Sequence, residues 1–166
     1  MSYDNIPDEL KALRQWICWR YDIRNGRRTK VPVNPKSKSA KPASTIDPET
    51  WGPFELAVKR SGLSGNGIVP VDGIGFVFTK DDPYIGIDID SDFDDDAMNV
   101  LDIVERIGSY AEWSPSGEGI HVICKGSIPT TRSGKHPKGI GVFQHSRFFT
   151  MTGKVFNVGQ ILHRNR

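Results

Sequence analysis

The sequence has 166 residues, of which 37% are hydrophobic and 25% are charged. This composition excludes an intrinsically disordered chain, and the length predicts a single domain over residues 1–166. No apolar run approaches the ~20 residues of a membrane-spanning helix, and residues 1–4 do not resemble a secretory signal. We therefore expect a cytoplasmic protein without membrane contact. Cys18 and Cys124 form no Cys-x-x-Cys motif, so we expect two buried free thiols.

The net charge of +2 conceals a strong charge pattern. Residues 1–45 contain ten Lys or Arg and four Asp or Glu, residues 80–118 contain two and twelve, and residues 119–166 contain eight and none. An acidic segment between basic ones is compatible with ordinary solvated surface charge. It is also compatible with a carboxylate cluster that holds cations, between basic groups that hold phosphates.

The first half of the chain predicts short elements around one hairpin. Asn25-Gly26 is typical of a two-residue hairpin turn. In chain order we expect a helix at residues 8–15, strands at 16–19 and 27–33, a polar loop at 34–44, and a helix at 47–57.

The second half is richer in strands. We expect residues 73–79 and 84–89 to form a strand pair across a tight turn. A helix at 97–107 follows, and then strands at 110–113, 120–125, 139–143, 148–152 and 155–156. Most connections are too short for parallel crossovers, so the predicted fold class is mixed α/β with largely antiparallel pairing.

The segment Ile87-Asp88-Ile89-Asp90 carries the first chemical signal. In a strand, alternate side chains point to the same face, so Asp88 and Asp90 should lie together while the isoleucines enter the core. Two carboxylates at this spacing repel each other unless a cation lies between them, which points to a divalent metal. The alternative is that both aspartates merely end the strand. A calcium loop is excluded because Phe93 stands where such a loop needs glycine.

Two further segments have residues suited to phosphate. Ser114-Pro115-Ser116-Gly117-Glu118-Gly119-Ile120-His121 offers hydroxyl and N–H groups in a tight loop, followed by a histidine. Ser146-Arg147-Phe148-Phe149-Thr150-Met151-Thr152-Gly153 places an arginine ahead of an aromatic strand. Taken alone, the first is equally compatible with an ordinary turn and the second with a surface charge.

The order of these segments is more specific than any one of them. The chain runs I-D-I-D, then W-S-P-S-G-E-G-I-H-V, then S-R-F-F-T-M-T-G, with W-I-C-W, T-K-V-P-V-N-P and D-P-E-T-W before them. This series resembles the primase–polymerase domains of the archaeo-eukaryotic primase superfamily, which occur at the N-termini of phage and mobile-element replication proteins. The resemblance covers most of the chain.

The resemblance implies a fold, a reaction and a site. The fold would be the α/β (α+β) primase core, in which an N-terminal α/β unit, about residues 1–70, packs with an RRM-like, mostly antiparallel sheet at about 71–166. The reaction would be nucleotidyl transfer with Mg²⁺ or Mn²⁺ in a bacterial or phage-infected cell. Expected partners are a DNA template and primer, dNTPs or NTPs, and a helicase domain or protein. Catalytic roles fall to Asp88 and Asp90, which bind the metal, and to His121. Residues that bind the nucleotide or phosphate would be Ser114, Ser116, Gly117, His121, Arg147 and Lys30.

One departure from the family pattern leaves the enzymatic activity open. The family places a third carboxylate in the strand before the arginine motif, and here that position is Gly141. No Asp or Glu follows Glu118, so the metal is held more weakly, a carboxylate such as Asp92 or Glu118 replaces the missing one, or polymerase activity is lost. The alternatives are an active primase–polymerase domain, an inactive relative that binds DNA or nucleotides within a replication complex, and an RRM-like module whose acidic residues have no chemical role. Three carboxylates around one point would favour the enzyme.

Overall fold

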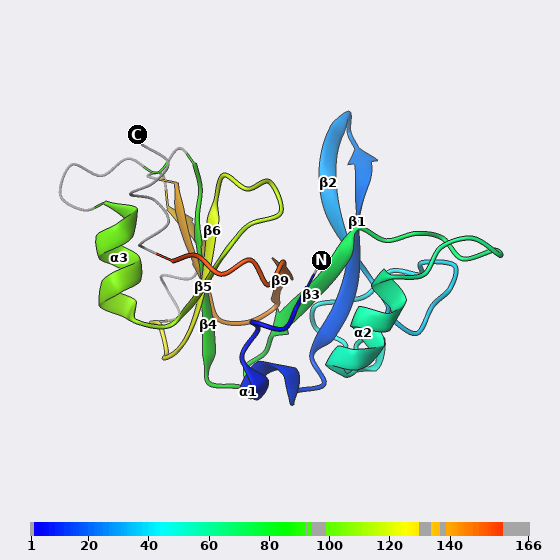
Figure 1. Cartoon of the computed structure of the whole chain (residues 1–166), viewed down its shortest axis with the longest axis horizontal. Coiled ribbons are helices and arrows are strands. Elements are labelled where there is room, and N and C mark those ends of the chain that lie inside the picture. Colours follow the sequence, from blue (N-terminus) through cyan, green and yellow to red (C-terminus); the bar gives the residue numbers. More distant parts are fainter. Residues whose placement is uncertain (1, 92, 94–98, 130–133, 137–138, 158–166) are drawn as a thin grey trace. The chain divides into compact units, whose positions relative to one another are not determined.

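The computed structural model describes residues 2–91, 93, 99–129, 134–136 and 139–157, apart from the side chains of residues 135 and 136. Its helices and strands confirm the mixed α/β class with antiparallel sheets (Figure 1). The strands are β1 (Trp16–Arg24), β2 (Arg27–Val33), β3 (Gly73–Phe78), β4 (Tyr84–Ile89), β5 (Tyr110–Trp113), β6 (Ile120–Lys125), β7 (Gly134–His136), β8 (Ile140–Phe143) and β9 (Arg147–Met151). The helices are α1 (Asp8–Lys11), the 3-10 helix η1 (Pro48–Thr50), α2 (Phe54–Ser61) and α3 (Val100–Ile107).

The chain divides into two compact units, each built on one sheet. The four-stranded unit comprises Pro7–Phe78 and Ser146–Met151, and the five-stranded unit comprises Met1–Ile6, Thr79–His145 and Thr152–Arg166. The boundary expected near residue 70 differs from this division, because β3 pairs with both β1 and β9 and so joins the four-stranded unit. No helix among the described residues is long and apolar enough to cross a membrane.

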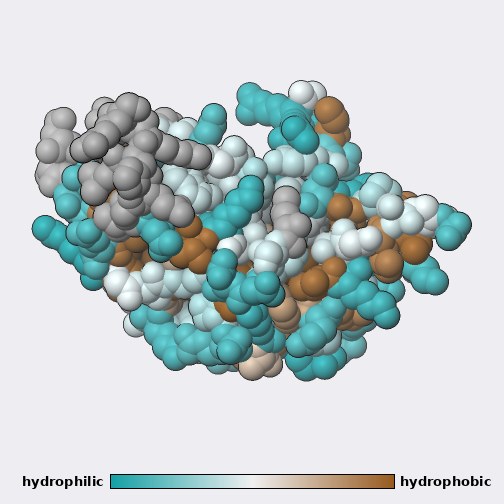
Figure 2. Space-filling view, viewed as in Figure 1, coloured by the Kyte–Doolittle hydropathy of each residue, from teal (hydrophilic) through white to brown (hydrophobic). Residues whose placement is uncertain are grey.

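The four-stranded sheet has the order β2-β1-β3-β9, and every pair in it is antiparallel. Asn25 and Gly26 both have positive φ angles, 51° and 74°, as the predicted hairpin turn requires. Ile17 and Val77 of this sheet form a buried cluster with Ala43 and Trp51. Large hydrophobic side chains are exposed at only three described positions, and hydrophilic residues cover most of the face that Figure 2 shows. The three are Ile23, Ile46 and Leu63.

Strands β3 and β4 do not pair with each other, so the strand pair predicted at 73–79 and 84–89 is wrong. Both strands exist, but β3 lies in the four-stranded sheet and β4 in the five-stranded one. The turn between them is held by Asp82, whose carboxylate accepts hydrogen bonds from the N–H and hydroxyl of Thr79 and from the N–H of Tyr84. Such bonds satisfy turn donors locally, without a hairpin.

The helix predicted at 47–57 is interrupted. Residues Pro48–Thr50 form η1, and α2 begins only at Phe54. Between them Trp51 is extended, and the N–H and C=O of Gly52 exchange hydrogen bonds with Trp16 at 2.9 and 3.0 Å. Pro53 then starts α2 because its fixed φ suits a helix N-terminus and disfavours a helical residue before it. The helix predicted at 8–15 is likewise shorter, ending at Lys11.

The five-stranded sheet has the order β5-β6-β4-β8-β7, so β4 lies at its centre. One face of this sheet is apolar, and Ile87, Ile89 and Val122 pack there with Ile103 and Val104 of α3. The Asn99 side chain caps α3 by accepting from the N–H of Asp102 at 2.9 Å, so the helix starts later than predicted. Residues 97 and 98 of the predicted helix lie outside the described residues. Because side chains alternate across a strand, Asp88 belongs to the opposite face.

Candidate nucleotide and metal site

A row of directly paired residues crosses the polar face of the five-stranded sheet. Asp88 on the central strand β4 pairs with His121 on β6 at one side and with Gly141 on β8 at the other. His121 in turn pairs with Glu112 on β5. Side chains directly opposite in antiparallel strands have Cβ atoms only about 5 Å apart. The strand register therefore brings residues of two predicted motifs, and the departure at position 141, onto adjacent strands.

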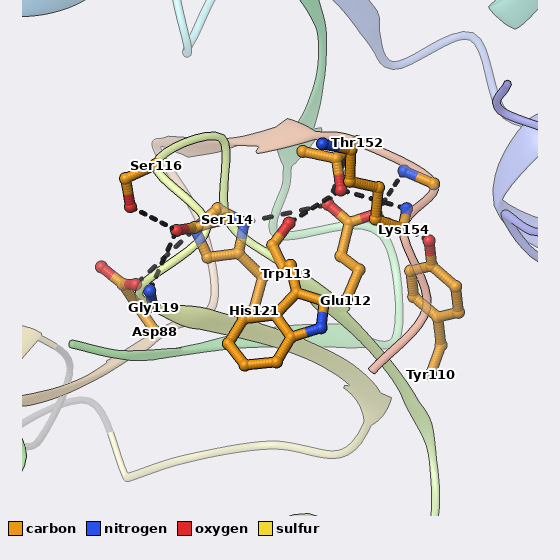
Figure 3. A network of polar contacts seen from close by, with 11 residues as sticks. Asp88, Tyr110, Glu112, Trp113, Ser114, Ser116, Gly119, His121, Thr152 and Lys154 are labelled. Carbon is orange, nitrogen blue, oxygen red and sulfur yellow. Dashed lines mark hydrogen bonds and ion pairs between the residues drawn. The ribbon is translucent and has the colours of Figure 1, made fainter. Parts of the chain in front are cut away.

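His121 lies between two carboxylates (Figure 3). Its Nε2 atom is 3.6 Å from Oδ1 of Asp88, and its Nδ1 atom is 3.9 Å from Oε1 of Glu112. The imidazole side chain is only 7% exposed, whereas that of Asp88 is 31% exposed. Asp88 thus presents its carboxylate to solvent at the point where the buried imidazole reaches it from β6.

Glu112 is completely buried and anchors the chain after β9. Its carboxylate accepts hydrogen bonds from the N–H groups of Thr152 and Gly153, at 2.9 and 2.8 Å, and from the hydroxyl of Tyr110 at 2.7 Å. Gly153 has φ +68°, and a Cβ there would lie 2.5 Å from the backbone oxygen of Ser2, so the turn requires glycine. The end of the S-R-F-F-T-M-T-G segment is thereby fixed to the strand beside His121.

Burial controls the ionisation of Glu112 and Tyr110. Desolvation raises the pKa of Glu112, and the hydrogen bonds from Tyr110, Thr152 and Gly153 offset only part of that rise. Burial also raises the pKa of Tyr110, and the neighbouring Glu112 raises it further, so the phenol stays protonated and acts as a donor.

The loop between β5 and β6 is closed by its own hydrogen bonds. The Ser114 hydroxyl lies 2.9 Å from the Ser116 hydroxyl and accepts from the N–H of Gly119 at 3.2 Å. The N–H groups of Gly117 and Glu118 bond to Ser114 and Ser116. The N–H groups of residues 117–119 are therefore already occupied within the loop, which leaves the exposed Ser116 hydroxyl as the more accessible polar group for an anion.

The carboxylates fit a divalent metal in part. Asp90 follows β4 directly, donates its N–H to the Gly139 oxygen at 2.8 Å, and is partly exposed like Asp88. Oxygen ligands of this kind suit Mg²⁺ or Mn²⁺, which keep water molecules where protein ligands are few. Among the described residues, no group of three or more His, Cys, Asp or Glu side chains could hold a metal. Glu118 is exposed, and Asp92 lies outside the described residues.

Two predicted phosphate contacts belong to the four-stranded unit. Arg147 is the exposed first residue of β9 and pairs with Phe78. Lys30 lies on β2, with its Nζ atom 5.8 Å from the centre of the Trp19 ring. Their roles stay predictions.

Sequence reasoning missed Glu112. A signal was present, because an acidic residue between Ala111 and Trp113 in an apolar strand is a candidate for a buried carboxylate that needs donors. The donors themselves lie about forty residues further along the chain, at Thr152 and Gly153, and only folding brings them together.

Comparisons with known proteins agree with the motifs. No protein-family model matches the chain. The chain is 35% identical over 156 residues to a protein named DNA Primase-polymerase from Nitratiruptor phage NrS-1. The match covers 89% of this chain but only 20% of that relative, so the chain spans about one fifth of the length of the curated protein it matches. The resemblance drawn from the motifs is thereby confirmed, and the chain is a homologue of part of a phage DNA primase-polymerase.

Proposed function

We propose that the chain is a primase–polymerase domain that carries out nucleotidyl transfer on a DNA template with Mg²⁺ or Mn²⁺, in phage or mobile-element replication in the bacterial cytoplasm. The observation that carries this proposal is the register of β4 and β6, which sets Asp88 and His121 side by side on an accessible face. The similarity to a phage DNA primase-polymerase supports the same reaction.

Each residue of the site has a proposed role. Asp88 and Asp90 would hold the metal, which when bound activates a 3′-hydroxyl and stabilises the leaving pyrophosphate. His121 and Ser116 would contact and orient the triphosphate, with Ser114 and Gly117 shaping the loop around it. Arg147 and Lys30 would contact phosphate groups of the nucleotide or the template, and a helicase stays a predicted partner.

A second candidate function has its own support. Gly141 lies directly opposite Asp88, where the family pattern would place a third carboxylate. With only two carboxylates the metal would be held more weakly, because a hard cation gains affinity with each anionic oxygen ligand. The alternative is therefore an inactive relative that binds DNA or nucleotides within a replication complex.

Primer extension and nucleotide binding separate these functions. Wild type, Asp88→Ala and the control Asp81→Ala, which removes an exposed acid outside the row, are compared with Mn²⁺ and with Mg²⁺. Extension by wild type and Asp81→Ala, lost in Asp88→Ala, supports the enzyme. Metal-dependent nucleotide binding that Asp88→Ala abolishes, without any extension, supports the inactive binder. If Asp88→Ala binds and extends like wild type, both proposals are wrong. Thermal stability should not fall, since the change removes one of two repelling carboxylates.

A further inference from the structure

The β1–β2 hairpin extends beyond the four-stranded sheet. Strand β1 pairs with β3 only through Trp16–Trp19, but it pairs with β2 as far as Arg24. Residues 20–30 therefore form a two-stranded ribbon, seen in blue in Figure 1, whose outer part pairs with no further strand of the described residues. A ribbon of this kind exposes both faces to solvent and to binding partners.

The ribbon carries an excess of positive charge. It contains five basic residues and one acidic residue, and the acidic one, Asp22, lies 4.0 Å from Arg20. Arg24, Arg27 and Arg28 make no ion pair with the described residues. Hydrophilic residues dominate the tip of the hairpin in Figure 2. The remaining basic residues are Arg24, Arg27, Arg28 and Lys30, of which the three arginines are exposed.

One face of the ribbon interleaves Arg28 and Lys30 with planar and apolar side chains, whereas Arg24 and Arg27 pair with each other on the opposite face. Tyr21 pairs with Lys30 across the strands, and Ile23 pairs with Arg28. The guanidinium carbon of Arg28 lies 3.6 Å from the centre of the Tyr21 ring. Ile23 beside it is 72% exposed. Stacking on the ring holds the guanidinium plane in place, so less conformational freedom is lost when a second planar group stacks on its outer side.

The chemistry of this face selects one class of partner. Exposed arginines suit a polyanion, and an ordered guanidinium plane beside an exposed apolar side chain suits flat unpaired bases. A double helix keeps its bases stacked inside and offers no such surface. We propose that the ribbon binds single-stranded nucleic acid. Arg28, supported by Tyr21, stacks against a base, and Arg24 and Arg27, on the opposite face near the tip of the ribbon, contact phosphates of the same strand. This proposal rests on the proposed function in one respect only: it takes the DNA template as the strand that the ribbon binds.

Fluorescence anisotropy of a labelled oligo(dT) of about 20 nucleotides, read in EDTA without nucleotides, tests the ribbon apart from metal chemistry. The test variant is Arg24→Ala/Arg27→Ala/Arg28→Ala. The matched control, Lys38→Ala/Lys41→Ala/Lys59→Ala, removes the same charge from exposed positions of the same unit. The test variant should bind at least about tenfold more weakly, and its slope of log affinity against log salt should fall by about 1.4, because each of the two phosphate contacts on a single strand contributes ~0.7. The control should stay within about twofold of wild type.

Two single variants complete the test. Arg28→Lys keeps the charge but loses the plane, and Tyr21→Ala removes the support of that plane, so each should weaken binding by about five- to tenfold. Asp88→Ala should bind the oligonucleotide like wild type, so that loss of extension in that variant is a failure of the metal site and not of the ribbon. The proposal is overturned if wild type does not bind oligo(dT), or if the arginine and lysine triple variants lose the same affinity.

Discussion

Removal of the Glu112 carboxylate should strongly lower the free energy of unfolding of the five-stranded unit. Glu112→Ala leaves the buried N–H groups of Thr152 and Gly153 and the hydroxyl of Tyr110 without their acceptor. Each buried donor left without a partner costs about 1–3 kcal/mol, so the two N–H groups alone predict a loss of about 4 kcal/mol. In urea unfolding followed by circular dichroism, this loss corresponds to a shift in the midpoint of ~2 M.

The control for this change is Glu118→Ala, which removes an exposed acid from the neighbouring loop and should alter stability by less than about 0.5 kcal/mol. A loss below about 1 kcal/mol in Glu112→Ala would refute the reasoning, because the three donors would then have found water or other acceptors.

Glu112→Gln tests whether the pKa of Glu112 is raised in the folded protein, because a raised pKa fixes the direction in which stability changes with pH. The amide has the shape of the protonated acid, so below the ordinary pKa of 4.5 the variant and wild type should have similar stability. As pH rises, the unfolded chain releases its proton at Glu112 before the folded chain does, and wild-type stability falls through the raised pKa. Unfolding measured at several pH values should therefore show wild type losing stability relative to Glu112→Gln. A relative gain with pH would mean that the three donors select the charged carboxylate.

Two further substitutions and one labelling experiment test other parts of the structure. Gly141→Glu should raise Mn²⁺ affinity in calorimetry by about tenfold, or ~1.4 kcal/mol, because the new carboxylate arrives opposite Asp88; unchanged affinity would mean that another group completes the site. Arg60 is 3% exposed and donates hydrogen bonds to the backbone oxygens of Ser37, Lys38 and Val69. Arg60→Met should therefore lower the free energy of unfolding, measured by thermal unfolding, by about 2 kcal/mol. The control Lys59→Met, at an exposed position, should leave it almost unchanged. Burial raises the pKa of Cys18 to about 12, so iodoacetamide at pH 8 should label it, by mass spectrometry, only in unfolded protein; labelling in the native state would contradict its burial.

The sequence by itself determined the strands and the chemistry of the polar face. Short apolar runs predicted eight of the strands near their observed positions, because alternation and turn residues act within a few neighbours. Asn25-Gly26 specified its hairpin for the same reason. The order of the I-D-I-D, W-S-P-S-G-E-G-I-H-V and S-R-F-F-T-M-T-G segments, with the N-terminal segments before them, carried the resemblance to primase–polymerases that the phage relative confirms. The break in the helix predicted at 47–57 also has a local signal, since Gly52-Pro53 is typical of a helix boundary.

Only the tertiary structure decided which strands are partners. β3 and β4 are five residues apart, yet they lie in different sheets, because each finds its hydrogen-bond partners in strands that come from other parts of the chain. Strand pairing also places Gly141 opposite Asp88, and the folded chain brings the N–H groups of Thr152 and Gly153 to Glu112. A residue's own neighbours do not encode these pairings. They follow from which arrangement buries the apolar faces while satisfying every buried donor, and that condition applies to the folded chain as a whole.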